Sequence, residues 1–323
     1  KNKKMLILNE KDIGKALSLN EFTQSIEETL LLNDSENVYM PDRAHVNFKG
    51  NTLLLMPSFI KKYTGTKLVS VYPKNVLKKH PAIQGLMVLN DGETGKPLAI
   101  MNGAKLTAMR TGAVGSIGVK YLTKKSASTL CIIGAGIQGF HQVLFACSQR
   151  PIKKVFVIDT KKSNIKIFEK QLSEIYPEID IITNTEVTEA IEKSEIIITA
   201  TTSKKAVIPD NPNLLKNKTF IGIGSFKPEM QEFPNSLFSL LSEYYTDTLF
   251  AKTETGDLAN PIKNNFIDEN KILTINKLII NNIVKTEGTQ AFKSVGMALF
   301  DVIVAKNIYE QAIEKNIGTR IDF

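Results

Sequence analysis

The sequence contains few of the residues that usually form metal sites and disulfide frameworks. Among its 323 residues are two cysteines, Cys131 and Cys147, and three histidines that lie far apart along the chain. None of them has the spacing of a zinc motif. We therefore expect no metal site, and we expect both cysteines to be reduced structural thiols in a cytoplasmic protein.

Long apolar runs and concentrated charge are also missing. No apolar segment approaches the roughly 20 residues that span a bilayer, and no signal-peptide segment opens the chain, so we expect no membrane partner. The net charge of +8 comes from scattered lysines, without a dense arginine stripe and interleaved aromatic residues. This pattern argues against a nucleic-acid partner and favours small anionic ligands.

The first 125 residues mix helical and strand patterns. Residues 12–33 have helical periodicity, and the turn-rich segment GETGK separates two strand candidates that should form a hairpin. The strand candidates are residues 44–48, 52–59, 67–73, 85–91 and 97–103. Residues 105–122 predict a long helix, in which Gly112 and Gly115 allow another element to approach closely.

From about residue 126 onward, strands and helices alternate. The strand candidates are residues 128–136, 154–159, 180–183, 195–202, 219–225 and 243–249. Such alternation predicts a parallel sheet with helices on both faces. We therefore predict an α/β protein in which an α+β domain (1–125) precedes a domain built on a parallel sheet (126–290). Residues 291–323 should form a C-terminal helix whose apolar stripe packs back on the first domain.

A glycine motif lies between the first strand and the first helix of the alternating region. Gly134 allows a tight turn, Gly136 lets the backbone approach a pyrophosphate, and Gly139 lets the helix pack against the strand. The N-terminus of the helix then offers free N–H groups to the phosphates. The motif predicts a dinucleotide cofactor.

An acidic residue favours NAD(H) over NADP(H). Asp159 ends the second strand, twenty residues after Gly139, where a carboxylate can accept hydrogen bonds from ribose hydroxyls and repels a 2′-phosphate. Thr160 and the two lysines after it could hold a phosphate if the loop shifted, so NADP(H) stays an alternative. Polar residues also follow the fourth strand, at the sheet edge where ligands bind: Thr201, Thr202 and Ser203.

The chain contains four separated motifs: GAKLTAMRTGAVGSIGVKYL, IIGAGIQG, GIGSFKPEMQE and FKSVGMALFD. In this order they resemble the ornithine cyclodeaminase/mu-crystallin family over nearly the whole length. The resemblance implies an N-terminal domain for substrate binding and dimerisation, a Rossmann domain, and a terminal helix that returns to the first domain. It also implies a homodimer and the use of NAD(P)(H) on α-amino or α-imino acids.

The resemblance assigns roles to individual residues. Arg43, Lys67 and Arg110 match the cations that bind the substrate carboxylate, for which the planar arginine fork is well suited. Lys67 could also pass a proton to or from an imine nitrogen, because neighbouring cations favour its neutral form. Met56 matches a pocket methionine. The implied cofactor contacts are Thr111, Gly134, Gly136, Ile137, Gln138, Gly139, Asp159, Thr160, Thr201, Thr202, Ser203, Gly224, Lys293 and Val295, the last two in a loop near the nicotinamide.

Two positions depart from the deaminase pattern of the family. Ser225 stands where ornithine cyclodeaminases have a catalytic aspartate, and a hydroxyl cannot act as a carboxylate base at neutral pH. Leu54 replaces the acidic residue that would hold a distal ammonium group. The pattern favours the ketimine reductase-like branch, with Ser225 bonded to the imine nitrogen or to an ordered water.

These residues predict NAD(P)H-dependent reduction of a cyclic α-imino acid, such as Δ1-pyrroline-2-carboxylate or Δ1-piperideine-2-carboxylate, to the L-amino acid. The alternatives are a linear amino-acid dehydrogenase of alanine or opine type, an ornithine cyclodeaminase, and a binding protein without turnover. His80 could donate a proton, but an exposed loop histidine is the simpler interpretation. For His141, one turn into the cofactor helix, a role outside the chemistry is likewise the simpler interpretation.

Overall fold

The structure is a computed structural model that describes residues 4–32, 37–78 and 80–322. It divides into two compact units, one of Lys1–Arg110 with Met297–Phe323 and the other of Thr111–Gly296. Within the described residues, each unit is built on one eight-stranded sheet.

The first unit is an α+β domain. Its elements are β1 (Met5–Leu8), α1 (Glu10–Ala16), α2 (Leu19–Leu32), β2 (Val38–Tyr39), β3 (Ala44–Phe48), β4 (Asn51–Ile60), β5 (Tyr63–Val71), η1 (Pro73–Lys78), β6 (Ile83–Asp91), β7 (Pro97–Asn102), the start of α3 (Gly103–Leu122), α12 (Ala298–Glu314) and β16 (Thr319–Ile321). The strand order is β16-β1-β7-β6-β5-β4-β2, and β3 also pairs with β4. The predicted hairpin is present, as the antiparallel pair β6 and β7.

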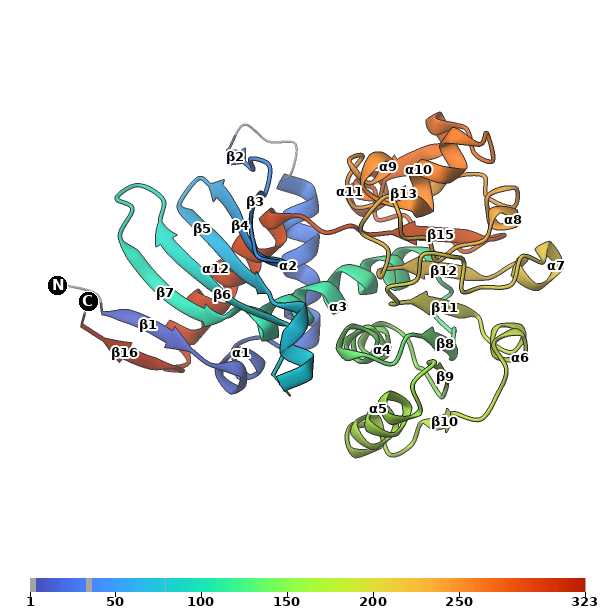
Figure 1. The fold of residues 1–323 in the computed structure, drawn as a ribbon, viewed down its shortest axis with the longest axis horizontal. Helices are drawn as coiled ribbons and strands as arrows, with labels where there is room; N and C mark the ends of the chain where they lie inside the picture. Colours follow the sequence, from blue (N-terminus) through green and yellow to red (C-terminus); the bar gives the residue numbers. More distant parts are fainter. Residues whose placement is uncertain (1–3, 33–36, 79, 323) are drawn as a thin grey trace. The chain divides into compact units, whose positions relative to one another are not determined.

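The C-terminal helix α12 covers one face of this sheet (Figure 1). Its side chains Leu299, Phe300 and Val302 are fully buried. On the same face, the strand register places Met56 opposite Lys67, and Lys67 opposite Met87. The packing of α12 therefore buries a lysine within an otherwise apolar row.

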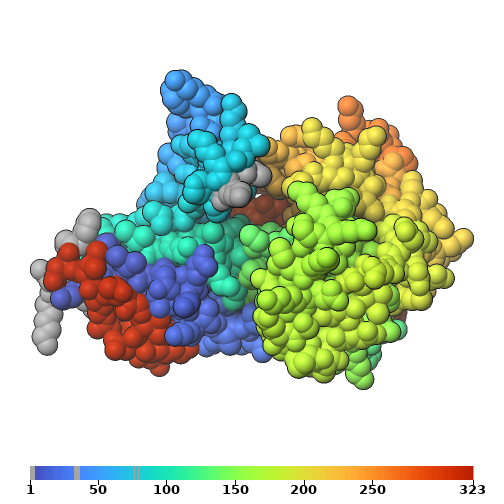
Figure 2. Space-filling view, turned by 60° about the horizontal axis from the view of Figure 1, so that its bottom comes forward, coloured from blue at the N-terminus to red at the C-terminus, as the bar shows by residue number. Residues whose placement is uncertain are grey.

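The two ends of the described chain also meet in this unit. Strand β1 pairs antiparallel with β16, with Met5 opposite Ile321, and parallel with β7. The space-filling view shows the red C-terminal segment beside the blue N-terminal one (Figure 2). Both strands are short, and the sequence patterns did not predict either of them.

The helical segment predicted at residues 12–33 is two helices in the structure. Leu17 is extended between α1 and α2. Ser18 and Glu21 then form reciprocal bonds, because the Ser18 N–H donates to Glu21 Oε2 at 2.7 Å and the Glu21 N–H donates to Ser18 Oγ at 3.3 Å. This capping box starts a new helix and overrides the continuous periodicity. Residue 33 lies outside the described residues.

The second unit is a doubly wound parallel domain. After the end of α3 its elements are β8 (Thr129–Ile133), α4 (Ile137–Gln149), β9 (Lys154–Ile158), α5 (Lys162–Ile175), β10 (Asp180–Ile182), α6 (Val187–Glu192), β11 (Ile196–Thr199), α7 (Pro212–Leu215), β12 (Thr219–Gly222), α8 (Asn235–Phe238), β13 (Tyr244–Thr246), α9 (Ala251–Glu254), α10 (Gly256–Lys263), η2 (Glu269–Lys271), β14 (Ile272–Thr274), α11 (Asn276–Ile280) and β15 (Gln290–Lys293). The strand order is β10-β9-β8-β11-β12-β15-β13-β14.

All neighbouring strands of this sheet are parallel. The continuous apolar runs in β8 and β11 are buried on both faces, as expected where helices flank a sheet on both sides (Figure 1). Burial raises the pKa of the Cys131 and Cys147 thiols to about 12, so both are protonated at neutral pH.

The chain order reverses at β8, which creates a switch point between β8 and β11.

The unit boundaries differ from the predicted residues 125 and 290. The division after Arg110 falls inside α3, whose later turns pack on the second unit. A Cβ on Gly112 would lie 2.5 Å from the Phe145 ring, and one on Gly115 would lie 1.7 Å from Gln142 Oε1. The predicted close approach is therefore confirmed, and it ties α3 to α4. The second unit runs to Gly296 because β15 pairs with β12 and β13.

Candidate active site

Two cations and one carboxylate meet inside the first unit. Lys67 comes from β5, Arg110 from α3 and Asp301 from α12. Lys67 Nζ lies 2.7 Å from Asp301 Oδ2, and Arg110 Nε donates to Asp301 Oδ1 at 3.1 Å. Their side chains are 3%, 10% and 0% exposed, so the group is almost dry. One carboxylate balances only one of two cations, so the cluster has a net positive charge that an anionic ligand would neutralise.

Burial lowers the pKa of Lys67 to about 8, from an ordinary 10.5. The Asp301 carboxylate opposes this shift, while the positive charges of Arg110 and Arg43 add to it. A lysine with this pKa exchanges a proton close to neutral pH, which an ordinary surface lysine does not.

The other residues predicted for the substrate pocket lie around Lys67. Met56 is its cross-strand partner and is mostly buried. Leu54, two residues earlier on the same face of β4, is half-buried. Arg43 is half-buried just before β3, near enough to influence the Lys67 ammonium. The structure thus brings together the predicted carboxylate-binding cations Arg43, Lys67 and Arg110.

Sequence reasoning missed Asp301, although the motif FKSVGMALFD contains it. The available signal was a single carboxylate within the apolar helix stretch MALFDVIVA. A fully buried aspartate is rare unless it is paired with a cation.

The predicted dinucleotide loop joins β8 to α4 in the second unit. Gly134 has a φ of +106°, which side chains rarely adopt, and its N–H donates to the Ile158 carbonyl at 2.8 Å. A Cβ on Gly139 would lie 1.8 Å from the Gly134 carbonyl oxygen, so only glycine allows this helix-to-turn contact. A Cβ on Gly136 would meet nothing within 4 Å. The space beside Gly136 can therefore admit a ligand.

The start of α4 has the properties of an anion site. Its N-cap residue, Gly136, makes no side-chain capping bond, and Ile137 is exposed. Gln138 Oε1 is buried and has no hydrogen-bond partner among the described residues. Uncapped N–H groups and the helix dipole favour a phosphate at this position.

Asp159 lies beside the glycine loop. Its Oδ2 accepts from the Ala135 N–H at 2.8 Å and from Asn164 Nδ2 at 3.2 Å, and its Oδ1 accepts from the Lys161 N–H at 2.7 Å. These bonds fix the carboxylate at the end of β9. Thr160 is exposed next to it.

The loops after β11 and β12 contain the next group of predicted residues. Thr201 and Gly224 are held close together, because a Cβ on Gly224 would lie 2.0 Å from the Thr201 carbonyl oxygen. Thr202 is exposed, whereas the Ser203 hydroxyl donates to Lys205 O within its own turn at 2.6 Å. In α3, the Thr111 carbonyl accepts from Gln142 Nε2 at 2.8 Å.

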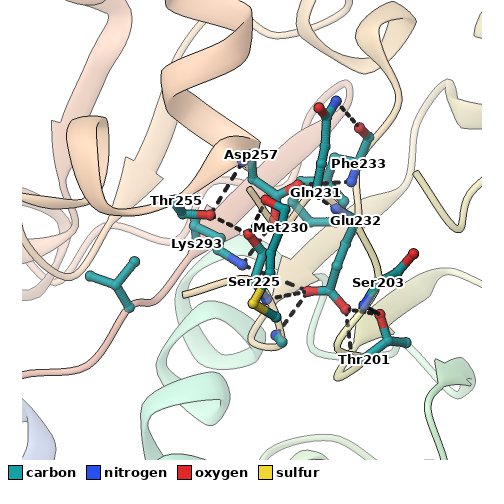
Figure 3. Close-up of polar contacts among 12 residues, drawn as sticks. Thr201, Ser203, Ser225, Met230, Gln231, Glu232, Phe233, Thr255, Asp257 and Lys293 are labelled. Atoms are coloured by element: carbon teal, nitrogen blue, oxygen red, sulfur yellow. Dashed lines mark hydrogen bonds and ion pairs between the residues drawn. The ribbon is translucent and has the colours of Figure 1, made fainter. Parts of the chain in front are cut away.

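The structure contradicts the role predicted for Ser225. Its side chain is 0% exposed. The hydroxyl donates to Met230 O at 2.6 Å and lies 2.5 Å from Thr255 Oγ1 (Figure 3). Both bonds shape the loop that follows β12. The Ser225 hydroxyl therefore has no surface left for an imine nitrogen or an ordered water.

Lys293 differs from its prediction for a similar reason. Its ammonium is fully buried, 2.9 Å from Asp257 Oδ2 and 3.7 Å from Glu232 Oε2 (Figure 3). It cannot contact a cofactor with this side chain, whereas Val295 in the following loop is half-buried. The Lys293 partners, Glu232 and Asp257, are a second set that sequence reasoning missed, although Glu232 ends the motif GIGSFKPEMQE.

The two histidines differ from each other. His80 is exposed, as expected. His141 is buried in α4, and its Nδ1 lies 2.8 Å from Ile137 O in the same helix. The helix face that packs inward explains this burial.

Comparison with known proteins places the chain in a family. The model of the ornithine cyclodeaminase/mu-crystallin family matches residues 3–316. The chain belongs to this family. Within the described residues, no helix of this chain is long and apolar enough to cross a membrane.

Several relatives in the family are similar over their full length. A Δ1-pyrroline-2-carboxylate reductase from Bacillus thuringiensis subsp. konkukian is 33% identical, covering 99% of this chain and all of that protein. The structure of the Thermococcus litoralis Δ1-pyrroline-2-carboxylate reductase with NADH and L-proline is 32% identical, with a TM-score of 0.88 over 98% of this chain and 100% of that one. An archaeal alanine dehydrogenase dimer with bound NAD is 29% identical, with a TM-score of 0.87 over 99% of both chains. These similarities confirm the predicted α/β fold.

Proposed function

We propose that this protein reduces a cyclic α-imino acid to the corresponding L-amino acid with NADH. The buried cluster of Lys67, Arg110 and Asp301 is the observation that carries the proposal, because it is a positively charged, water-poor site for a carboxylate. The Δ1-pyrroline-2-carboxylate reductases among the relatives support this substrate class.

The substrate carboxylate binds to the cations of this cluster. Asp301 engages Arg110 Nε and so fixes the plane of the guanidinium. A fixed guanidinium gives bidentate hydrogen bonds to a carboxylate at a small cost in entropy. Arg43 adds positive charge at the same place. The carbon of the C=N bond, next to the carboxylate, is thereby held in one position.

Lys67 supplies the proton. The imine becomes a better hydride acceptor when its nitrogen is protonated, and a lysine with a pKa of about 8 can donate this proton near neutral pH. The cyclic imine, one hydride and one proton together give the secondary amine of the product. Asp301 holds the Lys67 ammonium in place between turnovers.

The glycine loop and Asp159 fit a nicotinamide dinucleotide. The uncapped N–H groups at the start of α4 would receive the pyrophosphate region, and Asp159 would receive a ribose. When bound, NADH supplies the hydride for the C=N carbon. We propose NADH over NADPH because a 2′-phosphate would meet the Asp159 carboxylate.

The pocket residues favour a compact apolar ring over a diamino acid. Leu54 and Met56 on β4 lie on the same face of the sheet as Lys67 on β5. Neither side chain can bind a distal ammonium group. Ser225 provides no carboxylate for deamination, and its hydroxyl is occupied. A five- or six-membered cyclic imine satisfies these constraints.

The testing experiment follows NADH or NADPH oxidation with Δ1-pyrroline-2-carboxylate, in parallel with an Arg110→Met variant. Further reactions contain ornithine with NAD, read for ammonia, and pyruvate with ammonia and NADH. Rapid NADH oxidation by the cyclic imine, lost in Arg110→Met, is expected. Ammonia release from ornithine would overturn the proposal in favour of cyclodeamination. Turnover of pyruvate alone would instead indicate an alanine dehydrogenase.

We also propose a homodimer formed through the first unit. The sheet face opposite α12 presents several exposed apolar side chains: Val46, Leu53, Phe59 and Leu86. A monomer would leave this face in water, which soluble proteins avoid for large patches. The dimeric state of the related alanine dehydrogenase supports this assembly.

A further inference from the structure

A buried carboxylate joins two loops of the second unit. Glu232 Oε1 accepts from the Thr201 N–H at 2.7 Å and from the Thr201 hydroxyl at 2.9 Å. Its Oε2 accepts from the Gly224 N–H at 2.8 Å and from the Ser225 N–H at 3.0 Å. The four bonds connect the loop after β11 to the loop after β12 (Figure 3).

Two charged residues, Asp257 and Lys293, hold Glu232 in place. Asp257 Oδ1 accepts from the N–H groups of Glu232 and Phe233 at 2.7 and 2.9 Å. Lys293, at the end of β15, pairs with Asp257 Oδ2 and lies close to Glu232. All three charged side chains are 0% exposed. The ends of three neighbouring strands, β11, β12 and β15, are therefore linked through one charged network.

Stability alone does not account for this network. Burying two carboxylates and an ammonium carries a large desolvation penalty, and apolar residues of similar volume would often fill such a space at no loss of stability. The charges do provide fixed geometry, since Glu232 must accept from both loops at once. The loops it fixes lie at the carboxyl ends of parallel strands, where doubly wound sheets bind their ligands.

We propose that Glu232 is a positioning residue for the nicotinamide half of the dinucleotide site. The glycine loop after β8 serves the pyrophosphate, while β11, β12 and β15 belong to the second half of the sheet, which receives the other nucleotide. Glu232 sets the spacing of the Thr201 and Gly224 loops, and Asp257 with Lys293 holds Glu232. The inference rests on the dinucleotide site of the proposed function.

The test compares two ligands by titration calorimetry. NADH carries the nicotinamide, whereas ADP-ribose carries the adenosine and pyrophosphate without it. In Glu232→Gln an amide NH₂ group replaces one accepting oxygen, and one loop is left with unpaired N–H groups. We expect NADH affinity to fall about tenfold or more, while ADP-ribose affinity stays within about twofold. The ADP-ribose titration also reports whether the Rossmann fold is intact.

A second variant guards against misfolding of the first. Glu232→Asp keeps the charge beside Lys293, but its shorter side chain cannot reach both loops. It should therefore also lower the affinity for NADH relative to the affinity for ADP-ribose. Glu195→Gln is the matched control, because Glu195 Oε2 also accepts from backbone N–H groups, those of Ser128 and Thr129, at the start of β8. That end of the strand is remote from the ligand edge, so both affinities should stay unchanged.

Three results would overturn the inference. An unchanged NADH to ADP-ribose ratio in both Glu232 variants would show that the loop spacing does not serve the nicotinamide. Equal losses for both ligands would show a purely structural role. Wild-type protein that binds neither ligand would reject the dinucleotide site itself, and so would separate failure of the proposed function from failure of this inference.

Discussion

Lys67 Nζ and Asp301 Oδ2 lie 2.7 Å apart, between a strand of the first sheet and the helix that covers it. The two residues are far apart in sequence, and both side chains are almost completely buried. This pair places the candidate proton donor and, through Arg110, the carboxylate-binding group. The same contact therefore contributes to the stability of the fold and to the proposed activity.

Replacing Asp301 by asparagine should destabilise the protein strongly. Lys67 and Arg110 would remain buried without their counter-charge, which typically costs about 3–5 kcal/mol. Urea unfolding at neutral pH measures the loss. Asp322→Asn is the matched control, because Asp322 forms an exposed pair with Lys4 at 3.0 Å, worth about 0–1 kcal/mol. Equal small effects of both variants would contradict the argument.

Arg110→Lys should impair turnover while retaining the charge. The guanidinium fork is lost, so the substrate carboxylate loses its paired hydrogen bonds. We expect kcat/KM for the cyclic imine to fall by a factor that corresponds to about 2–5 kcal/mol of lost transition-state stabilisation. Arg320→Lys, the same change on the exposed β16, should leave kcat/KM unchanged. A normal kcat/KM in Arg110→Lys would remove Arg110 from substrate binding.

Local patterns predicted much of the fold. Alternating strands and helices gave the parallel sheet, and the glycine spacing gave the β8–α4 turn, because both depend on neighbouring residues. The pairing of β1 with β16 was not predictable in this way, since each is short and its partner lies at the other end of the chain. Periodicity does not indicate the break at Leu17, because the apolar spacing continues through it and the break depends on the Ser18–Glu21 capping box.

The candidate site was predicted only in part. Motifs identified Lys67 and Arg110, but the partner of both, Asp301, becomes evident only when α12 folds onto β5. Ser225 shows the opposite failure. Its position in a motif suggested contact with substrate, whereas the chain folds Met230 and Thr255 over its hydroxyl. Spacing along the sequence does not determine which way a loop side chain points.

Imine reduction should weaken as pH rises through about 8. The pKa of Lys67 is lowered to about 8 by burial, so below this pH the ammonium can donate a proton and above it the neutral amine cannot. The profile of kcat/KM reports groups of the free enzyme, so its alkaline limb should fall near this value. Oxidation of the amino acid, which needs the neutral amine, should rise over the same range. Lys67→Met should remove this limb, and the exposed control Lys62→Met should keep it.

Asp159→Ala should relax the cofactor preference. The carboxylate beside the glycine loop repels a 2′-phosphate, and alanine removes this repulsion together with the ribose hydrogen bonds. We expect the ratio of kcat/KM for NADH to that for NADPH to fall by about tenfold or more. Asp180→Ala, at the exposed start of β10, is the matched control. A ratio that stays at the wild-type value would assign the preference to other residues.

The outer face of the first sheet should control the oligomeric state. Leu86 is 48% exposed at the centre of this face, on β6. A lysine there would place a charge within the proposed dimer interface, where an unpaired charge is costly. Leu86→Lys should therefore shift the molar mass in light scattering from that of a dimer to that of the 35.9 kDa chain. Leu77→Lys is the control, since Leu77 is 86% exposed in η1, outside the sheet. If Leu86→Lys remains dimeric at low concentration, the interface must lie elsewhere, and if the wild type is already monomeric, the apolar face serves another partner.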